Sequence, residues 1–155
     1  MIRTLVAIAA LSFSAPAFAD GHSTGDAEAG AKTFKKCKSC HMIEAADGEV
    51  IVKGGRSGPN LFGVVGMTAG TVEGFKYSKD LMAAGEAGLV WDEASLATWV
   101  QDPKAFLKDY LDNSKAKSKM SFKLKKGGED VAAYLASVGP AVEEAAETDE
   151  VKTDG

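Results

Sequence analysis

The segment KTFKKCKSCHMIE, residues 32–44, limits what this chain can fold into more than any other part of the sequence. Two residues separate Cys37 from Cys40, and His41 follows the second cysteine directly. Zinc sites, dithiol oxidoreductases and covalently attached haem each use part of this pattern. Each kind of site needs different further ligands or secondary structure from the rest of the chain, so the remaining sequence decides among the three.

The N-terminus indicates export. Arg3 supplies a positive start, residues 5–13 form an apolar run, and Ala17-Phe18-Ala19 is a small-x-small cleavage site. This pattern predicts a signal peptide over residues 1–19, and an uncleaved anchor is the alternative. The apolar run is too short to span a bilayer, and no later stretch is long enough. We therefore expect a soluble, exported protein that starts near Asp20 and has no stable membrane anchor. We also expect it to be a monomer.

Charge divides the mature chain into a neutral body and an acidic tail. Residues 20–139 carry 16 basic and 16 acidic side chains, whereas residues 140–155 hold six acids and one lysine. The body is one domain's worth of chain. The tail is predicted to be disordered and solvated. The net negative charge of the chain argues against nucleic acid as a partner, because nucleic-acid binding requires a basic surface.

The periodicity of the chain predicts an all-α fold. The expected helices fall within residues 26–40, 74–85, 91–103, 103–111 and 127–140. In the third helix Asp92 is a candidate cap, and Leu96, Trp99 and Val100 recur on one face. Pro103 should end that helix and open the next. A turn-rich loop over residues 47–60 has room for one short hairpin near residues 50–52, and no longer strand is expected.

Covalent haem is the chemistry that uses all three residues of the opening motif. A structural zinc needs four ligands, but the chain has two cysteines, His41 and His22, and His22 lies in a polar lead-in. A dithiol oxidoreductase would need a preceding strand, and a simple disulfide would leave His41 without a role. Each thiol can instead form a thioether with one haem vinyl group, and His41 can bind the iron axially.

A second axial ligand must come from elsewhere in the chain. Met42 is adjacent to His41 and cannot reach the opposite side of a haem. Met67 and Met82 lie in apolar contexts that are typical of core packing. Met120 lies in NSKAKSKMSFKLKKGG, which is too polar to bury itself. We predict that this segment covers the haem and that Met120 binds the iron; a surface methionine is the alternative.

The order of motifs resembles the soluble monohaem c-type cytochromes, most closely the larger bacterial cytochrome c2 type. The resemblance runs from Gly30 to Leu135 and rests on Gly30 and Phe34 before CKSCH, then GPNLFGVVG, GFKYS, LVW, LATWV, KSKMSF and DVAAYL. It implies the cytochrome c fold, in which several helices surround one covalently bound haem c.

The resemblance also implies roles for residues around the haem. The Pro59 carbonyl would accept a hydrogen bond from Nδ1 of His41. Tyr77 and Trp91 would bind one haem propionate and Ser118 another. Without the resemblance, Tyr77 and Trp91 would be interpreted as core aromatics with satisfied polar tips.

Packing roles and two departures follow from the same comparison. Gly30 would let the first and last helices cross closely, with Phe34 and Tyr134 packed at the crossing. Met67 stands where the family usually has an arginine near a propionate. Trp99 stands where a tyrosine is usual, close to the ligating methionine.

The predicted function is one-electron transfer and not catalysis. With His41 and Met120 both bound, the iron has no open position for a substrate. The resemblance implies a periplasmic shuttle that takes electrons from a cytochrome bc1-type complex to a terminal oxidase or a photosynthetic reaction centre. The alternative is a haem enzyme or small-ligand binder with an open distal position, which the departures at Met67 and Trp99 favour slightly.

Lysines concentrate around the two ligand segments. Ten of the 16 bases of the body lie there, and no acid falls between Asn113 and Gly128. These lysines predict a positive surface that steers the haem edge toward acidic membrane complexes, although a merely solvated surface is the alternative. The predicted docking residues are Lys35, Lys36, Lys38, Lys117, Lys119 and Lys123.

Overall fold

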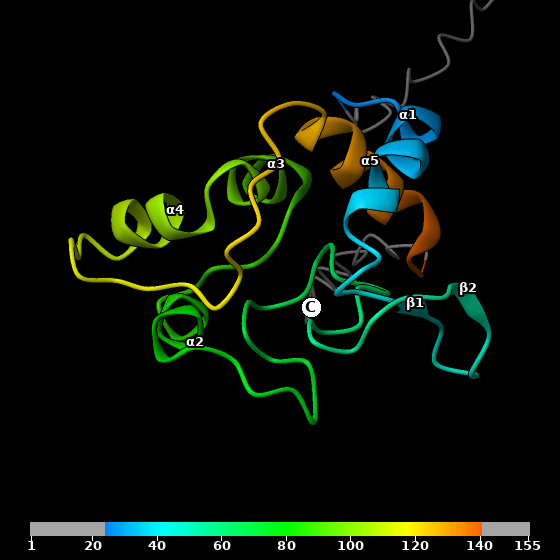
Figure 1. Ribbon diagram of the computed structural model, residues 1–155. Coiled ribbons are helices and arrows are strands. Elements are labelled where there is room, and N and C mark those ends of the chain that lie inside the picture. The colour runs from blue at the N-terminus through cyan, green and yellow to red at the C-terminus, as the bar shows by residue number, and fades with distance from the viewer. Residues whose placement is uncertain (1–23, 141–155) are drawn as a thin grey trace, which may run out of the picture.

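The structure is a computed structural model that describes residues 24–140. Helices dominate it, which confirms the all-α prediction (Figure 1). In chain order the elements are α1 (Ala27–Thr33), the 3₁₀ helix η1 (Phe34–Lys36), β1 (Ile43–Glu44), β2 (Val50–Val52), α2 (Lys79–Glu86), α3 (Glu93–Gln101), α4 (Pro103–Tyr110) and α5 (Gly128–Val138). The predicted signal peptide, His22 and the tail after Pro140 lie outside the described residues.

The first and last helices cross at Gly30. A Cβ atom at this position would lie 1.9 Å from the backbone oxygen of Asp130, so only glycine allows the approach. The rings of Phe34 and Tyr134 pack beside the crossing with their centroids 5.6 Å apart. Asp26 caps α1, because its carboxylate accepts hydrogen bonds from the next turn. The crossing therefore matches the arrangement that the family resemblance implies.

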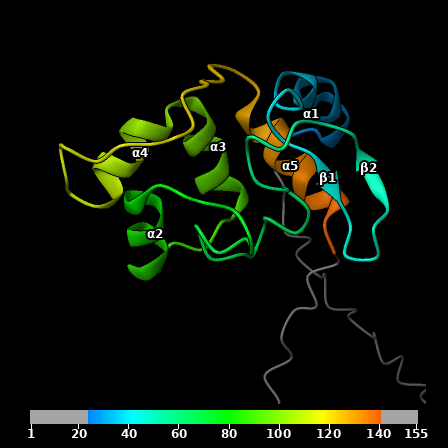
Figure 2. The same ribbon diagram turned by 60° about the horizontal axis from the view of Figure 1, so that its bottom comes forward.

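Helices α2, α3 and α4 form the other half of the molecule, and α3 packs against α5 where the two halves meet (Figures 1 and 2). Asp92 caps α3 through a reciprocal pair of hydrogen bonds with Ser95. Pro103 opens α4 as predicted, and Asp102 caps that helix through the backbone N–H of Ala105. None of the described helices is long and apolar enough to cross a membrane.

Two details differ from the sequence expectations. The helix predicted over residues 26–40 ends at Thr33 and continues as η1 and turns, so the cysteines follow the helix instead of lying on it. Met82, interpreted as core, is 41% exposed, because α2 turns Leu81 and Ala84 inward instead.

The hairpin expected near residues 50–52 is present as the antiparallel pair of β1 and β2.

Candidate haem-binding site

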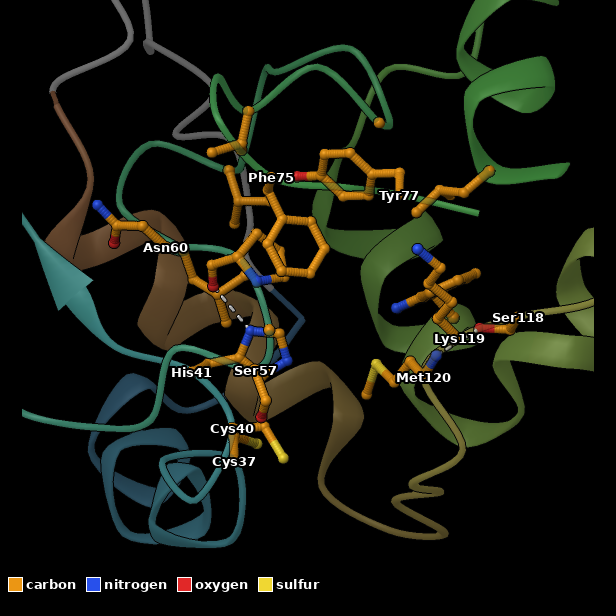
Figure 3. Close-up of a pocket in the computed structure, with 18 of the residues that line it drawn as sticks. Cys37, Cys40, His41, Ser57, Asn60, Phe75, Tyr77, Ser118, Lys119 and Met120 are labelled. Atoms are coloured by element: carbon orange, nitrogen blue, oxygen red, sulfur yellow. Dashed lines mark hydrogen bonds between the residues drawn. The ribbon is translucent and has the colours of Figure 1, made fainter. Parts of the chain in front are cut away.

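One cavity of about 520 Å³ collects the two cysteines, His41 and Met120. Figure 3 shows His41 and Met120 on opposite sides of an open space, with Cys37 and Cys40 at one end of it. Apolar side chains line much of the cavity, among them Leu61, Val64, Leu81, Trp91, Leu96 and Trp99. We call this space the haem cavity.

The turn after η1 orients the three residues of the motif. The backbone N–H groups of Cys40 and His41 both donate to the carbonyl of Cys37, at 3.1 and 3.0 Å. Cys37 is half-buried, and burial raises the pKa of its thiol to about 11, with a further rise from the neighbouring Cys40. Hydrogen bonds with Ser57 and Ser39 lower the pKa of the exposed Cys40 thiol. Both cysteines are free thiols, so both sulfurs remain for thioether formation.

The imidazole of His41 is held in one tautomer. Its Nδ1 lies 2.9 Å from the carbonyl oxygen of Pro59. Because a carbonyl only accepts, Nδ1 donates the proton and Nε2 keeps its lone pair. Burial lowers the pKa of His41, and the hydrogen bond to Pro59 opposes that shift. A neutral ring with a free Nε2 is the form that binds a metal.

Two residues that the sequence interpretation missed support this ring. A Cβ at Gly58 would lie 2.4 Å from Cε1 of His41, so only glycine fits against the imidazole. The side chain of Asn60 makes three hydrogen bonds: Oδ1 accepts from the backbone N–H groups of Glu44 and Phe62, and Nδ2 donates to the Glu44 carbonyl at 2.7 Å. Asn60 thus ties the Pro59 segment to β1. The GPN run placed both residues beside Pro59, but it did not predict their contacts with His41 and β1.

The segment that carries Met120 is anchored by small buried side chains. Ala116 and Leu124 are 0% and 4% exposed, and the backbone N–H of Leu124 donates to the Val100 carbonyl at 2.7 Å. The hydroxyl of Ser118 accepts a hydrogen bond from the backbone N–H of Met120 at 3.0 Å. These contacts fix the backbone on both sides of Met120, so its side chain lines the haem cavity from the α2–α4 half.

Comparisons with known proteins identify the family. No protein-family model matches the chain. The chain is 62% identical over 139 residues to cytochrome c-551 of Roseobacter denitrificans, covering 89% of this chain and 96% of that protein. It is 58% identical over 135 residues to cytochrome c2 of Rhodobacter capsulatus, covering 87% and 95%. The solved structure of cytochrome c2 from Rhodobacter capsulatus matches with a TM-score of 0.73 at 61% identity, covering 74% of this chain and 98% of that one. The chain belongs to the cytochrome c2 family.

Membership of the cytochrome c2 family confirms the cofactor and the class of function. The protein carries one covalently bound haem c, and it is an electron carrier and not an enzyme. The residues present fit this group: two free thiols at one end of a largely apolar cavity, an imidazole with a free nitrogen, and a thioether opposite it. The alternative of a haem enzyme finds no support among these relatives.

The cytochrome c2 resemblance assigned three residues to the haem propionates, and all three line the haem cavity: Tyr77, Trp91 and Ser118. Each makes different contacts with the protein. The Tyr77 hydroxyl makes a hydrogen bond with the backbone of Val72, and burial raises its pKa. Trp91 and Trp99 are 6% and 7% exposed, and within residues 24–140 neither indole N–H has a protein acceptor. No fully buried side-chain nitrogen among the described residues lacks a partner, so both indole nitrogens keep some exposed surface. Because both residues line the haem cavity, both N–H groups are available to a bound group.

The predicted docking lysines differ in their contacts. All six are exposed, and Lys36 and Lys119 line the haem cavity. Nζ of Lys119 donates to the backbone carbonyl of Lys76 at 2.6 Å. Lys123 forms an ion pair with Asp102 at 2.6 Å, which reduces the positive charge that Lys123 presents. No local pattern predicted this pairing, because the two residues are 21 positions apart in the chain.

Proposed function

We propose that Cys37 and Cys40 attach haem c through thioether bonds and that His41 and Met120 are the axial ligands of its iron. The observation that carries this proposal is the single cavity that all four side chains line. When bound, the haem iron changes valence by one electron. The protein's part is to hold both ligands in place, so that little rearranges when an electron arrives or leaves.

The surroundings of the ligands favour the reduced state. Met120 would contribute a neutral sulfur, and the buried walls around it, such as Leu96 and Trp99, keep water away. A neutral ligand in an apolar site stabilises ferrous iron over the more highly charged ferric iron, which raises the reduction potential. The hydrogen bond from His41 to Pro59 fixes the ring and increases the basicity of Nε2.

The spectrum of the purified protein tests the ligation. We expect a low-spin ferric spectrum with the far-red band of methionine–iron ligation, and a reduced form that does not bind carbon monoxide. Rapid binding of carbon monoxide to the unmodified protein would show an open distal position and would overturn the assignment of Met120.

We infer that the protein works in the periplasm, after removal of residues 1–19, and shuttles electrons from a cytochrome bc1-type complex to a terminal oxidase or a photosynthetic reaction centre. The exposed lysines beside the haem cavity support docking to acidic surfaces of such complexes. We call the set Lys35, Lys36, Lys38, Lys117, Lys119 and Lys123 the lysine face.

Charge neutralisation tests the lysine face. Replacing Lys117 and Lys119 with glutamine should slow electron transfer to an acidic partner severalfold at low ionic strength and leave the rate nearly unchanged at high salt. The matched control is Lys53→Gln with Lys104→Gln, which removes the same charge at two exposed positions outside the face. Equal losses in both variants, or a loss independent of salt, would contradict docking through this face.

A further inference from the structure

Residues 114–127 carry an exposed row of lysines, and we call this segment the lysine loop. It runs from α4 to α5 along the α3–α4 side of the molecule (Figure 1). The buried side chains of Ala116 and Leu124 pin it to the core. Its six lysines are all exposed, and it contains no acid; they are Lys115, Lys117, Lys119, Lys123, Lys125 and Lys126.

The described residues offset little of this charge. The pair of Lys123 with Asp102 is the one salt bridge that the loop makes within residues 24–140. The carboxylate of Asp80 accepts the backbone N–H of Lys117 at 2.8 Å and brings one more negative charge close. Lys119 donates to a neutral carbonyl. Six lysines therefore face two acids, and a surplus of positive charge remains at the surface.

The sequence after Pro140 carries the opposite charge. Residues 141–155 hold six acids against Lys152 alone. This segment follows closely after α5, which ends at Val138. A Cβ added at Gly139 would lie 3.5 Å from the Cα of Gly63, which stands in the chain between the cavity-lining residues Leu61 and Val64. Fifteen extended residues span up to about 50 Å. A domain of this size has a radius of gyration of about 13 Å and so a diameter of roughly 35 Å. The segment is long enough to reach the lysine loop.

We propose that residues 141–155 bind the lysine loop of the same molecule. Residues 141–155 match the lysine loop in the sign and number of their charges, and they are long enough to reach it. Single exposed ion pairs are weak, so the contact exchanges readily and depends on the sum of its charges. Its tethering supplies an effective concentration in the millimolar range, which makes it independent of protein concentration. The segment would thus compete with any acidic partner for the loop; that consequence, unlike the contact itself, rests on the proposed function.

Amide chemical shifts of the reduced holoprotein test the contact. The full mature chain is compared with a chain that ends at Pro140 and with a full chain whose six tail acids are changed to Asn or Gln. At about 10 mM salt, where the Debye length is about 30 Å, we expect both variants to differ from the parent at residues 114–127. At about 1 M salt, where it is about 3 Å, these differences should vanish. Differences confined to the residues next to the cut, or differences that grow with protein concentration, would overturn binding in the same molecule.

A kinetic cycle tests whether the contact shields the loop. Ferricyanide, an anionic oxidant, takes one electron from the reduced protein and becomes ferrocyanide. Removal of the tail should speed this reaction roughly tenfold at low salt. The gain should shrink in a chain with Lys115, Lys117 and Lys125 changed to glutamine, and persist with Lys53, Lys104 and Lys108 changed instead. The same gain in both backgrounds would mean that the tail acts through net charge alone, and would overturn shielding of the loop. Failure of the proposed docking to membrane complexes would leave the shift differences unchanged, so the two ideas are tested separately.

Discussion

Replacing Gly30 with alanine tests how closely α1 and α5 approach. Two effects oppose each other. Alanine favours the helix by about 1 kcal/mol relative to glycine. The new Cβ, however, would lie 1.9 Å from the Asp130 oxygen and 2.7 Å from Cβ of Tyr134, whereas ordinary contact is 3.4–4 Å. Since the nearest atom belongs to the backbone, α5 itself must withdraw by more than 1 Å.

The cost of that withdrawal exceeds the gain in helix propensity. Overpacking a tight interface costs about 1–3 kcal/mol, and a clash with backbone belongs at the upper end. The shift would also loosen the contact of Phe34 with Tyr134. We expect the free energy of unfolding to fall by about 2 kcal/mol and the melting temperature by roughly 8 °C.

Guanidinium unfolding of the holoprotein, followed by far-ultraviolet circular dichroism, measures this change. Ala31→Gly is the control, because Ala31 is an exposed residue of the same helix and this change alters propensity alone. It should cost about 1 kcal/mol. If Gly30→Ala proves as stable as the parent chain, the two helices do not pack at the distance described above and the reasoning fails.

Three further predictions concern the site and its supports. Met120→Ala should let the reduced protein bind carbon monoxide. It should also lower the reduction potential, measured by redox titration, by more than about 59 mV, which is a tenfold change in the equilibrium constant of a one-electron reduction. An unchanged potential would point to another distal ligand. Asn60→Leu removes three hydrogen bonds and leaves backbone groups of Glu44 and Phe62 unpaired, so it should lower the free energy of unfolding by about 2–3 kcal/mol in chemical denaturation. Hydrogen bonds with Ser95 lower the pKa of Asp92, so the stabilisation by its carboxylate is present above the ordinary carboxyl pKa near 4 and is lost as the pH falls through the folded value. Asp92→Asn should retain the cap but lose this part of the acid sensitivity, as measured by the free energy of unfolding at falling pH.

Local signals in the sequence predicted most of the elements. Asp92 and Pro103 act through their immediate neighbours, so their positions alone located the start of α3 and of α4. The spacing of Cys37, Cys40 and His41 indicated the cofactor for the same reason, because attachment to one edge of a haem is a short-range constraint.

Contacts between distant segments were beyond the reach of the sequence. Lys123 was predicted as a free docking charge, but folding brings it to Asp102. Met82 has an apolar context along the chain, yet the packing of α2 leaves it exposed. Gly58 matters because His41 comes to rest against it, and no local pattern describes that approach. In each case the missing information was the position of a second segment.

The alternation of anchors and lysines around Met120 has a consequence for how such proteins diverge. Ala116 and Leu124 hold the backbone from the inside, while the lysines between and beside them touch little of the core. Exchange of Lys117, Lys125 or Lys126 should therefore leave the thioether in place, whereas Lys119 and Lys123 make contacts of their own. Under the proposed roles of Met120 and the lysine face, a lineage could change which redox complex it recognises while its reduction potential stays constant, since the two properties would depend on opposite sides of one strip of polypeptide.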